Sequence, residues 1–404
     1  MANLYSQLER TLASSGADAA IDQLIATLRD RGEYGPLFYA HLLKARQALG
    51  VSPNPTEPAS ELPEQHHAAY EEAIRAAART VGNLYLDVGD IPAAWSYFRL
   101  INDPEPVRTA LDQVILDENS ETYPLVDIAF HQNVHPRRGF DIVLDHQGIC
   151  SAITLVSSFE AALAPDLRVY TIGRLVRSLY GQLHERLRGI VADSEGSSPA
   201  TYLPLDQLIA GRDWLFEGEP WHIDQSHLNA VVQLSIHLPS GEELELARML
   251  CRYGAWLPAG LRGTGDPPFE NVYADYGMYL QVLAGDEVDA GLNHFRAKAD
   301  AADPERTTGP AEVLVNLLLA SGRDADALAA ARRHLIRADE RQLRCPGPQE
   351  LSRRLGRFDV FADVARLRGD AVQFLAGLLS APKNEPTAQT EPTAQTEPAA
   401  RARD

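Results

Sequence analysis

Regularly spaced glycines constrain the fold of the C-terminal part of this chain. Gly285, Gly322 and Gly356 are 37 and 34 residues apart, and each follows an apolar segment with helical periodicity. Small residues lie five positions after the first two glycines, at Ala290 and Ala327. A period of this length is expected for stacked pairs of helices that are joined by tight turns. The pattern therefore predicts an all-α chain built from helix pairs.

The segment from Ala68 to Pro106 has small, aromatic and turn-forming residues at regular offsets, namely Gly82, Tyr85, Gly89, Ala94, Phe98 and Pro106. These offsets resemble those of the tetratricopeptide repeat (TPR), a helix–turn–helix unit of about 34 residues. Two positions depart from the family pattern, since Ala78 replaces a large residue and Phe361 replaces a small one in the last C-terminal copy. The resemblance implies a TPR-like α-α superhelix, or solenoid, with a concave binding surface, and it implies no reaction.

The chain divides into repeat-like blocks and segments without repeats. The stretch 51–65 contains four prolines and few apolar residues, which indicates a connector. The tail 383–404 contains EPTAQT twice and no large apolar residue, so we expect it to be disordered. The predicted division is N-terminal helices at 1–50, a TPR-like helix pair at 66–106, an irregular, non-repetitive central segment at 107–268, C-terminal TPR-like pairs at 269–382, and the tail.

The central segment contains two further predicted helices. A long amphipathic helix begins at Leu167 and ends in a serine- and glycine-rich stop. A second helix begins at Asp224, which is a plausible N-cap. A long insertion between repeat blocks is a common place for binding. Functional residues are therefore expected in this segment.

The charge balance excludes two classes of partner. The chain of 404 residues has a formal charge of −19, whereas nucleic acids and anionic membranes attract clustered lysine and arginine. The sequence therefore predicts no nucleic-acid and no membrane partner. Its N-terminus lacks a basic stretch followed by an apolar one, and no segment supplies the roughly 18 apolar residues of a membrane span. We expect a cytoplasmic protein, and three widely separated cysteines agree with a reducing compartment.

Histidines are concentrated in HQNVHPRRGFDIVLDHQGIC, from His131 to Cys150. His131 and His135 are four residues apart in what reads as one helix, so both imidazoles would lie on one face. His146 and Cys150 form a second such pair if residues 140–156 are helical, while the β-branched content of this stretch leaves a strand as the alternative. Side chains paired in this way are able to share a metal ion.

A second group of candidate ligands lies in WHIDQSH, at 221–227. Asp224 and His227 are three residues apart at a helix start and would face together. A transition metal takes nitrogen, sulfur and oxygen ligands from two or three elements, and an open coordination position activates a water. The predicted cofactor is a divalent transition metal, zinc before others. Its candidate ligands are His131, His135, His146, His222, His227 and Cys150.

Neighbouring side chains extend this predicted site, and each also has a structural interpretation. Arg137 and Arg138 would clamp a carboxylate or phosphate of a ligand, or instead complement a helix dipole. Glu219 and Trp221 suit a small polar ligand, although an aromatic residue in such a loop also serves as an anchor. His135 precedes Pro136 at a helix end, where the dipole stabilises a cationic imidazole. A metal site, a metal-free polar pocket and scattered structural histidines therefore all remain open.

These patterns favour a cytoplasmic TPR-like protein that binds a small polar ligand, a peptide or a protein at its His-rich site, with or without a metal. One alternative is a metal-dependent hydrolase, lyase or isomerase in which Asp224 or Glu217 acts as the catalytic base. Another is a peptide-binding scaffold without a metal. The chain has no dinucleotide fingerprint, no P-loop and no nucleophile-elbow motif, so nucleotide binding and serine hydrolysis have no support.

Overall fold

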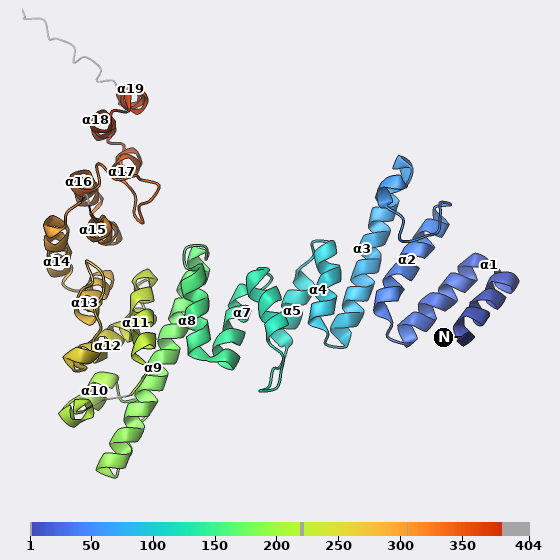
Figure 1. Ribbon diagram of the computed structural model, residues 1–404, viewed down its shortest axis with the longest axis horizontal. Coiled ribbons are helices and arrows are strands. Elements are labelled where there is room, and N and C mark those ends of the chain that lie inside the picture. The colour runs from blue at the N-terminus through green and yellow to red at the C-terminus, as the bar shows by residue number, and fades with distance from the viewer. Residues whose placement is uncertain (1, 219–221, 305, 382–404) are drawn as a thin grey trace, which may run out of the picture. The chain divides into compact units, whose positions relative to one another are not determined.

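The computed structural model describes residues 2–218, 222–304 and 306–381, and every regular element in this part of the chain is a helix (Figure 1). The predicted all-α class is confirmed, and residues 140–156 are helical rather than a strand. The tail predicted to be disordered, 383–404, lies outside the described residues. Contacts divide the chain into two units, Met1–Leu250 and Cys251–Asp404, which are described separately.

The first unit is built from helices that pack on their neighbours in the chain, from α1 on α2 to α4 on α5, and later α8 on α9. Two π-helical turns, η2 (Asp127–His131) and η3 (Val143–Gln147), interrupt its central part. Its helices are α1 (Ala2–Asp30), α2 (Tyr34–Ala48), α3 (Glu64–Asp87), α4 (Ile91–Leu100), α5 (Glu105–Gln113), α6 (Tyr123–Val126), α7 (Pro136–Ile142), α8 (Gly148–Phe159), α9 (Pro165–Glu195), α10 (Leu205–Ile209) and α11 (Gln225–Leu234), and α12 (Glu242–Trp256) spans the division.

The first fifty residues form three helical segments, because Gly16 leaves helical geometry with φ 86° and ψ 180° and so divides α1 in two. The proline-rich connector at 51–65 is held by Arg46, whose side chain is buried. Its guanidinium donates to the carbonyl oxygens of Ser52 at 3.2 Å and Glu57 at 2.8 Å, and it also pairs with the Glu57 carboxylate. Backbone carbonyls of an irregular segment need such donors once water is excluded.

Helices α3 and α4 pack against each other across a tight turn. Gly89 lies in the turn between them with φ 79°, a conformation that costs a residue with a Cβ atom more than it costs glycine. Asp90 caps α4 by accepting a hydrogen bond from the Ala93 amide at 3.0 Å. The buried Phe98 ring fills the space beside Gly82. These contacts bring the two helices close together.

The second unit repeats this arrangement of helix, glycine turn and helix. Gly285, Gly322 and Gly356 have φ values of 84°, 69° and 65° and lie in the turns after α13, α15 and α17. Each helix from α13 onward packs on the next. The helices are α13 (Val272–Leu283), α14 (Val288–Ala301), α15 (Gly309–Ala320), α16 (Asp324–His334), α17 (Pro348–Arg354), α18 (Phe358–Arg368) and α19 (Ala371–Ser380).

The two helices predicted in the central segment are present. The long one is α9, and Gly196 ends it in the left-handed region with φ 72°. The second is α11, and Asp224 is its N-cap, as predicted. Both belong to the first unit, where α11 packs on α8 and α9. The sequence between them, which fits no repeat, contributes α10 and the short 3₁₀ helix η4 (Asp213–Phe216).

One helical run, Pro136–Phe159, is long and apolar enough to cross a membrane by length and composition. Gly148, with φ 82°, interrupts it, and Phe140, Ile142 and Ala152 are buried against the rest of the unit. Core helices of soluble proteins have the same length and composition as this run. The expected absence of a membrane partner therefore stays a prediction.

We expect Gly82→Ala to destabilise the protein by about 1–3 kcal/mol, which is typical of overpacking. A Cβ atom at Gly82 would lie 2.6 Å from the Phe98 ring, and this buried ring cannot move away without disturbing its neighbours. Urea unfolding followed by circular dichroism measures the change. The control is Gly181→Ala in α9, where nothing lies within 4 Å of the new atom, so that the higher helix propensity of alanine should stabilise. Equal stability of the two variants would refute this account.

Candidate functional site

The helix predicted to place His131 and His135 on one face is interrupted between them. η2 ends at His131, Asn133 has φ 60°, and α7 begins only at Pro136. Proline disfavours helical angles in the preceding residue, and His135 has φ −148° and ψ 70°. The predicted pairing of these two imidazoles on a continuous helix is therefore wrong.

His135 caps the start of α7 rather than lying at a helix C-terminus. Its Nδ1 accepts a hydrogen bond from the Arg138 amide at 3.4 Å, and its Nε2 lies 2.9 Å from the Asp112 carboxylate. The predicted stabilisation of a cation by the helix dipole does not apply here, because the N-terminal end of a helix favours negative charge. Both ring nitrogens have partners within the protein.

His146 and Cys150 lie in helical segments, but Gly148 separates them. With φ 82° and ψ 172°, this glycine divides η3 from α8, so the two side chains do not share one turn of a regular helix. Both side chains are exposed.

Arg138 binds the end of the preceding helix. Its Nε donates to the Leu111 carbonyl oxygen at 3.0 Å, and its Nη2 donates to that of Val114, also at 3.0 Å. These oxygens lie at the C-terminal end of α5, where helix carbonyls have no partner of their own. Arg137 pairs with Asp166 at 3.3 Å, and its guanidinium lies over the Tyr170 ring at 5.0 Å. Of the two arginines that we expected either to clamp a ligand or to complement a helix dipole, Arg138 interacts with the C-terminal end of a helix.

A polar cluster that the sequence patterns did not indicate fixes α7 and η3 to α9. The Tyr170 hydroxyl donates to Asp141 Oδ2 at 2.6 Å, and Arg174 Nε donates to Asp141 Oδ1 at 3.0 Å. Arg174 also lies 3.6 Å from Asp145. Burial, and then the neighbouring Asp141, raise the pKa of Tyr170 to about 12, so its hydroxyl remains protonated. The polar residues of this stretch therefore connect helices to each other.

In the second candidate stretch, Asp224 Oδ1 accepts from the Ser226 amide at 2.7 Å and from its hydroxyl at 2.6 Å. The hydroxyl and then the amide hold the Asp224 pKa below its usual value, which makes this carboxylate a weak base. His222 is buried, and its ring meets that of Phe216 edge-on. Glu217 is exposed, and His227 is half-buried on α11. Glu219 and Trp221 lie outside the described residues.

No group of three or more His, Cys, Asp or Glu side chains able to hold a metal occurs within residues 2–218, 222–304 and 306–381. The predicted metal and its ligands therefore remain a prediction, and metal analysis of the purified protein is the direct test. Two of the candidate residues, the predicted ligand His135 and the predicted base Asp224, already have hydrogen-bond partners in the protein. Binding a metal at either would require breaking the hydrogen bonds described above.

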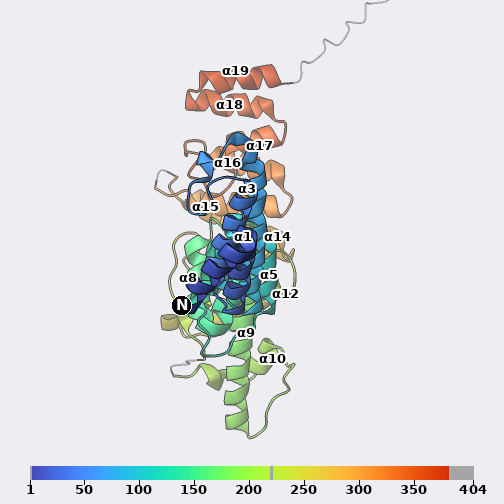
Figure 2. The ribbon, with the colours of Figure 1, turned by 90° about the vertical axis from the view of Figure 1, so that its right-hand side faces the viewer.

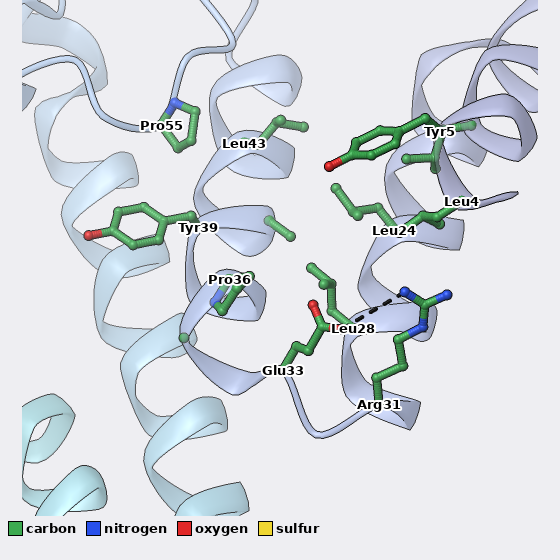
Figure 3. A pocket seen from close by; sticks show the side chains of 13 residues that line it. Leu4, Tyr5, Leu24, Leu28, Arg31, Glu33, Pro36, Tyr39, Leu43 and Pro55 are labelled. Carbon is green, nitrogen blue, oxygen red and sulfur yellow. Dashed lines mark ion pairs between the residues drawn. The ribbon is translucent and has the colours of Figure 1, made fainter. Parts of the chain in front are cut away.

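The first unit contains an apolar groove of about 660 Å³ that sequence patterns did not reveal (Figure 3). It lies between the two segments of α1 and the side of α2 that faces them, and Tyr5 and Leu43 extend toward the space between these helices. The Tyr5 side chain is 62% exposed. Two of the lining residues are charged, Arg31 and Glu33, and they lie 3.8 Å from each other. The principal apolar lining residues are Leu4, Leu8, Leu24, Leu28, Pro36, Tyr39 and Pro55.

A second polar cluster lies in the other unit, around the buried Asp275. Its carboxylate oxygens lie 2.8 Å from His294 Nε2 and 3.0 Å from Lys298 Nζ, and one of them accepts from the Asn271 amide. Lys298 also donates to the Pro268 carbonyl oxygen at 2.6 Å. The carboxylate thus has three donors, which is what a buried charge requires. The cluster joins α13, α14 and the segment before α13.

Comparisons with known protein families, with curated proteins and with solved structures found no match to this chain. The resemblance to TPRs therefore remains an expectation from the quoted residues.

Arg138→Met should lower the free energy of unfolding by about 2–4 kcal/mol, since it removes two hydrogen bonds from a charged donor and leaves two carbonyl oxygens unpaired. Arg137→Met, which breaks an exposed ion pair, should cost less than about 1 kcal/mol. Urea unfolding of both variants measures the difference. If the two arginines instead only clamp a ligand, neither substitution should change the free energy of unfolding.

His222 should make the protein less stable as the pH falls below neutrality. Burial, and then the charge of Arg186, lower the pKa of His222 from 6.5. Between that lowered pKa and 6.5 the unfolded chain binds a proton that the folded chain does not, so the free energy of unfolding falls as the pH drops through this window. We expect His222→Gln to reduce this pH dependence in unfolding experiments at several pH values. An unaltered profile in His222→Gln would count against the burial argument.

Proposed function

We propose that this protein is a helical-repeat binding protein whose N-terminal groove takes an amphipathic helix of a partner protein. The groove between α1 and α2 is the observation that supports the proposal, because it is open, apolar and lined by side chains of helices that are held in place (Figure 3). An amphipathic helix with aliphatic residues at every third and fourth position is the partner that such a groove suits.

The distribution of polar groups favours a protein segment over a small polar ligand. Sites for small ligands combine apolar walls with several polar groups that converge and fix the ligand's orientation. Here Arg31 and Glu33 supply the charges, and they pair with each other. The remaining lining of leucine, tyrosine and proline side chains gains most from burying further apolar surface.

His135 and Arg138 of the His-rich stretch are less suited to binding a ligand, because they already have partners in the chain. Arg138 contacts carbonyl oxygens of Leu111 and Val114, and His135 contacts Asp112. A ligand there would compete with these internal hydrogen bonds. The contacts of His135 and Arg138 therefore give no support to a metal-dependent enzyme. A binding protein without a metal is supported by the groove.

The repeat architecture forms part of the same proposal. Helix pairs joined by turns at Gly89, Gly285, Gly322 and Gly356 support a TPR-like superhelix, since repeats of this kind stack by contacts between neighbours. The first two helices, α1 and α2, have apolar side chains that line an open groove and are available to a partner. The groove lies on these first helices.

Selection and binding of helical peptides test the proposal. A displayed library of amphipathic helices is selected on the full chain, and a selected peptide is labelled and titrated by fluorescence polarisation. We expect Tyr5→Ser combined with Leu43→Gln to weaken binding at least about tenfold, which corresponds to the loss of one or two buried apolar contacts. Circular dichroism establishes that the variant is folded.

The matched control combines Tyr202→Ser with Leu12→Gln, two exposed side chains that are not part of the groove lining. This control should bind as tightly as the unchanged protein. Equal binding by the groove variant, or a library that yields no binder, would sink the proposal.

A further inference from the structure

The last helix, α19, is fixed to α18 by one face (Figure 2). Gly377 permits the close approach, because a Cβ atom there would lie 2.9 Å from the Phe361 ring and 3.0 Å from the Ala362 side chain. The guanidinium of Arg366 lies over the Phe374 ring at 4.8 Å. Asp370 caps α19 by accepting from the Gln373 amide at 3.0 Å. The orientation of α19 is therefore well defined.

The opposite face of α19 consists of exposed aliphatic side chains. Val372, Leu375 and Leu379 are 77%, 56% and 77% exposed, and their spacing of three and four residues places them on one side of the helix. The neighbouring Leu378 is 51% exposed. No residue of α19 is charged. We call this surface, made by Val372, Leu375, Ala376 and Leu379, the α19 face.

An exposed face of this kind is unusual for the end of a helical array. Terminal helices of repeat proteins ordinarily present polar side chains outward, which keeps them soluble. Burying a valine or leucine side chain contributes roughly 1.5–3 kcal/mol, so covering several of them is strongly favourable. Contiguous apolar surface on a folded protein marks an interaction site.

The residues that follow α19 cannot supply the cover. Between 382 and 404 the chain contains proline, threonine, alanine, glutamine and charged residues, but no large apolar side chain. The charge distribution allows a second copy of this chain to cover the face. Two chains of charge −19 repel over most of their surface, whereas α18 and α19 together carry two carboxylates and two guanidinium groups. Two copies are therefore able to approach there without strong repulsion.

We propose that the α19 face joins two copies of this chain in a twofold-symmetric dimer. A twofold axis through the middle of the face makes the two α19 helices antiparallel, so that Ala376 meets its own copy and Val372 of one chain lies near Leu379 of the other. Ala376 lies at the centre of the face, between Val372 and Leu379, and its small side chain allows close approach of the helices. Each aliphatic side chain is then buried against its symmetry mates.

Light scattering coupled to size-exclusion chromatography, over a range of micromolar concentrations, tests the dimer. The unchanged protein should have twice the 44.3 kDa mass of one chain. Val372→Glu combined with Leu379→Glu should give the monomer, because it would bury four carboxylates at the interface. The control is Val88→Glu with Ile115→Glu, two exposed aliphatic residues elsewhere, which should leave the dimer intact. Circular dichroism verifies folding in each case.

Cysteine crosslinking tests the symmetry. In a Cys150→Ser background, which removes the exposed native thiol, Ala376→Cys should form a disulfide-linked dimer on oxidation. Ser380→Cys, at the end of the helix, should not, because an antiparallel arrangement separates the two copies of this residue. A monomer at every concentration, a dimer that survives the double glutamate change, or crosslinking through Ser380→Cys alone would overturn the proposal. So would a monomer whose α19 face binds lipid vesicles instead.

Discussion

Close approach of helices at positions without a side chain is the constraint on which both units depend. Phe98 lies against Gly82 in the first unit, and Val282 lies against Gly291 in the second. At both positions a Cβ atom would overlap its neighbour, at 2.6 Å and 2.2 Å respectively. Packing in protein interiors is dense, so such a contact determines the distance between two helices and the fit of all side chains between them.

Once the helices are paired, their ends and connections need hydrogen-bond partners, and polar residues of the central segment supply them. Arg138 binds the end of α5, His135 caps α7, and Asp141 joins α7 to α9. Buried backbone groups without such partners would cost about as much as a lost hydrogen bond. A local excess of histidine and arginine therefore reflects, at these positions, the irregularity of the backbone around them.

The surfaces that we propose for binding are apolar, unlike the polar clusters that hold the helices together. The groove of α1 and α2 and the α19 face are apolar, lie on the first and last helices, and have few charged residues. Inner helices of both units bury their apolar stripes against a neighbour on each side. On α1 and α19 part of the apolar surface stays exposed, as at Tyr5, Leu375 and Leu379.

Local sequence determined the helical class, the turn glycines, the length of α9 and the N-cap at Asp224, because periodicity, positive φ and capping act over a few residues. The predicted pairing of His131 with His135 failed because the break at Asn133 and Pro136 outweighed the helical periodicity. Only the tertiary structure decided which partner each polar side chain has. Arg138 and Leu111 are 27 residues apart in the chain, and Arg174 and Asp141 are 33 apart. The groove likewise exists only where α1 bends at Gly16 and meets α2, since a cavity depends on how helices pack rather than on any one segment.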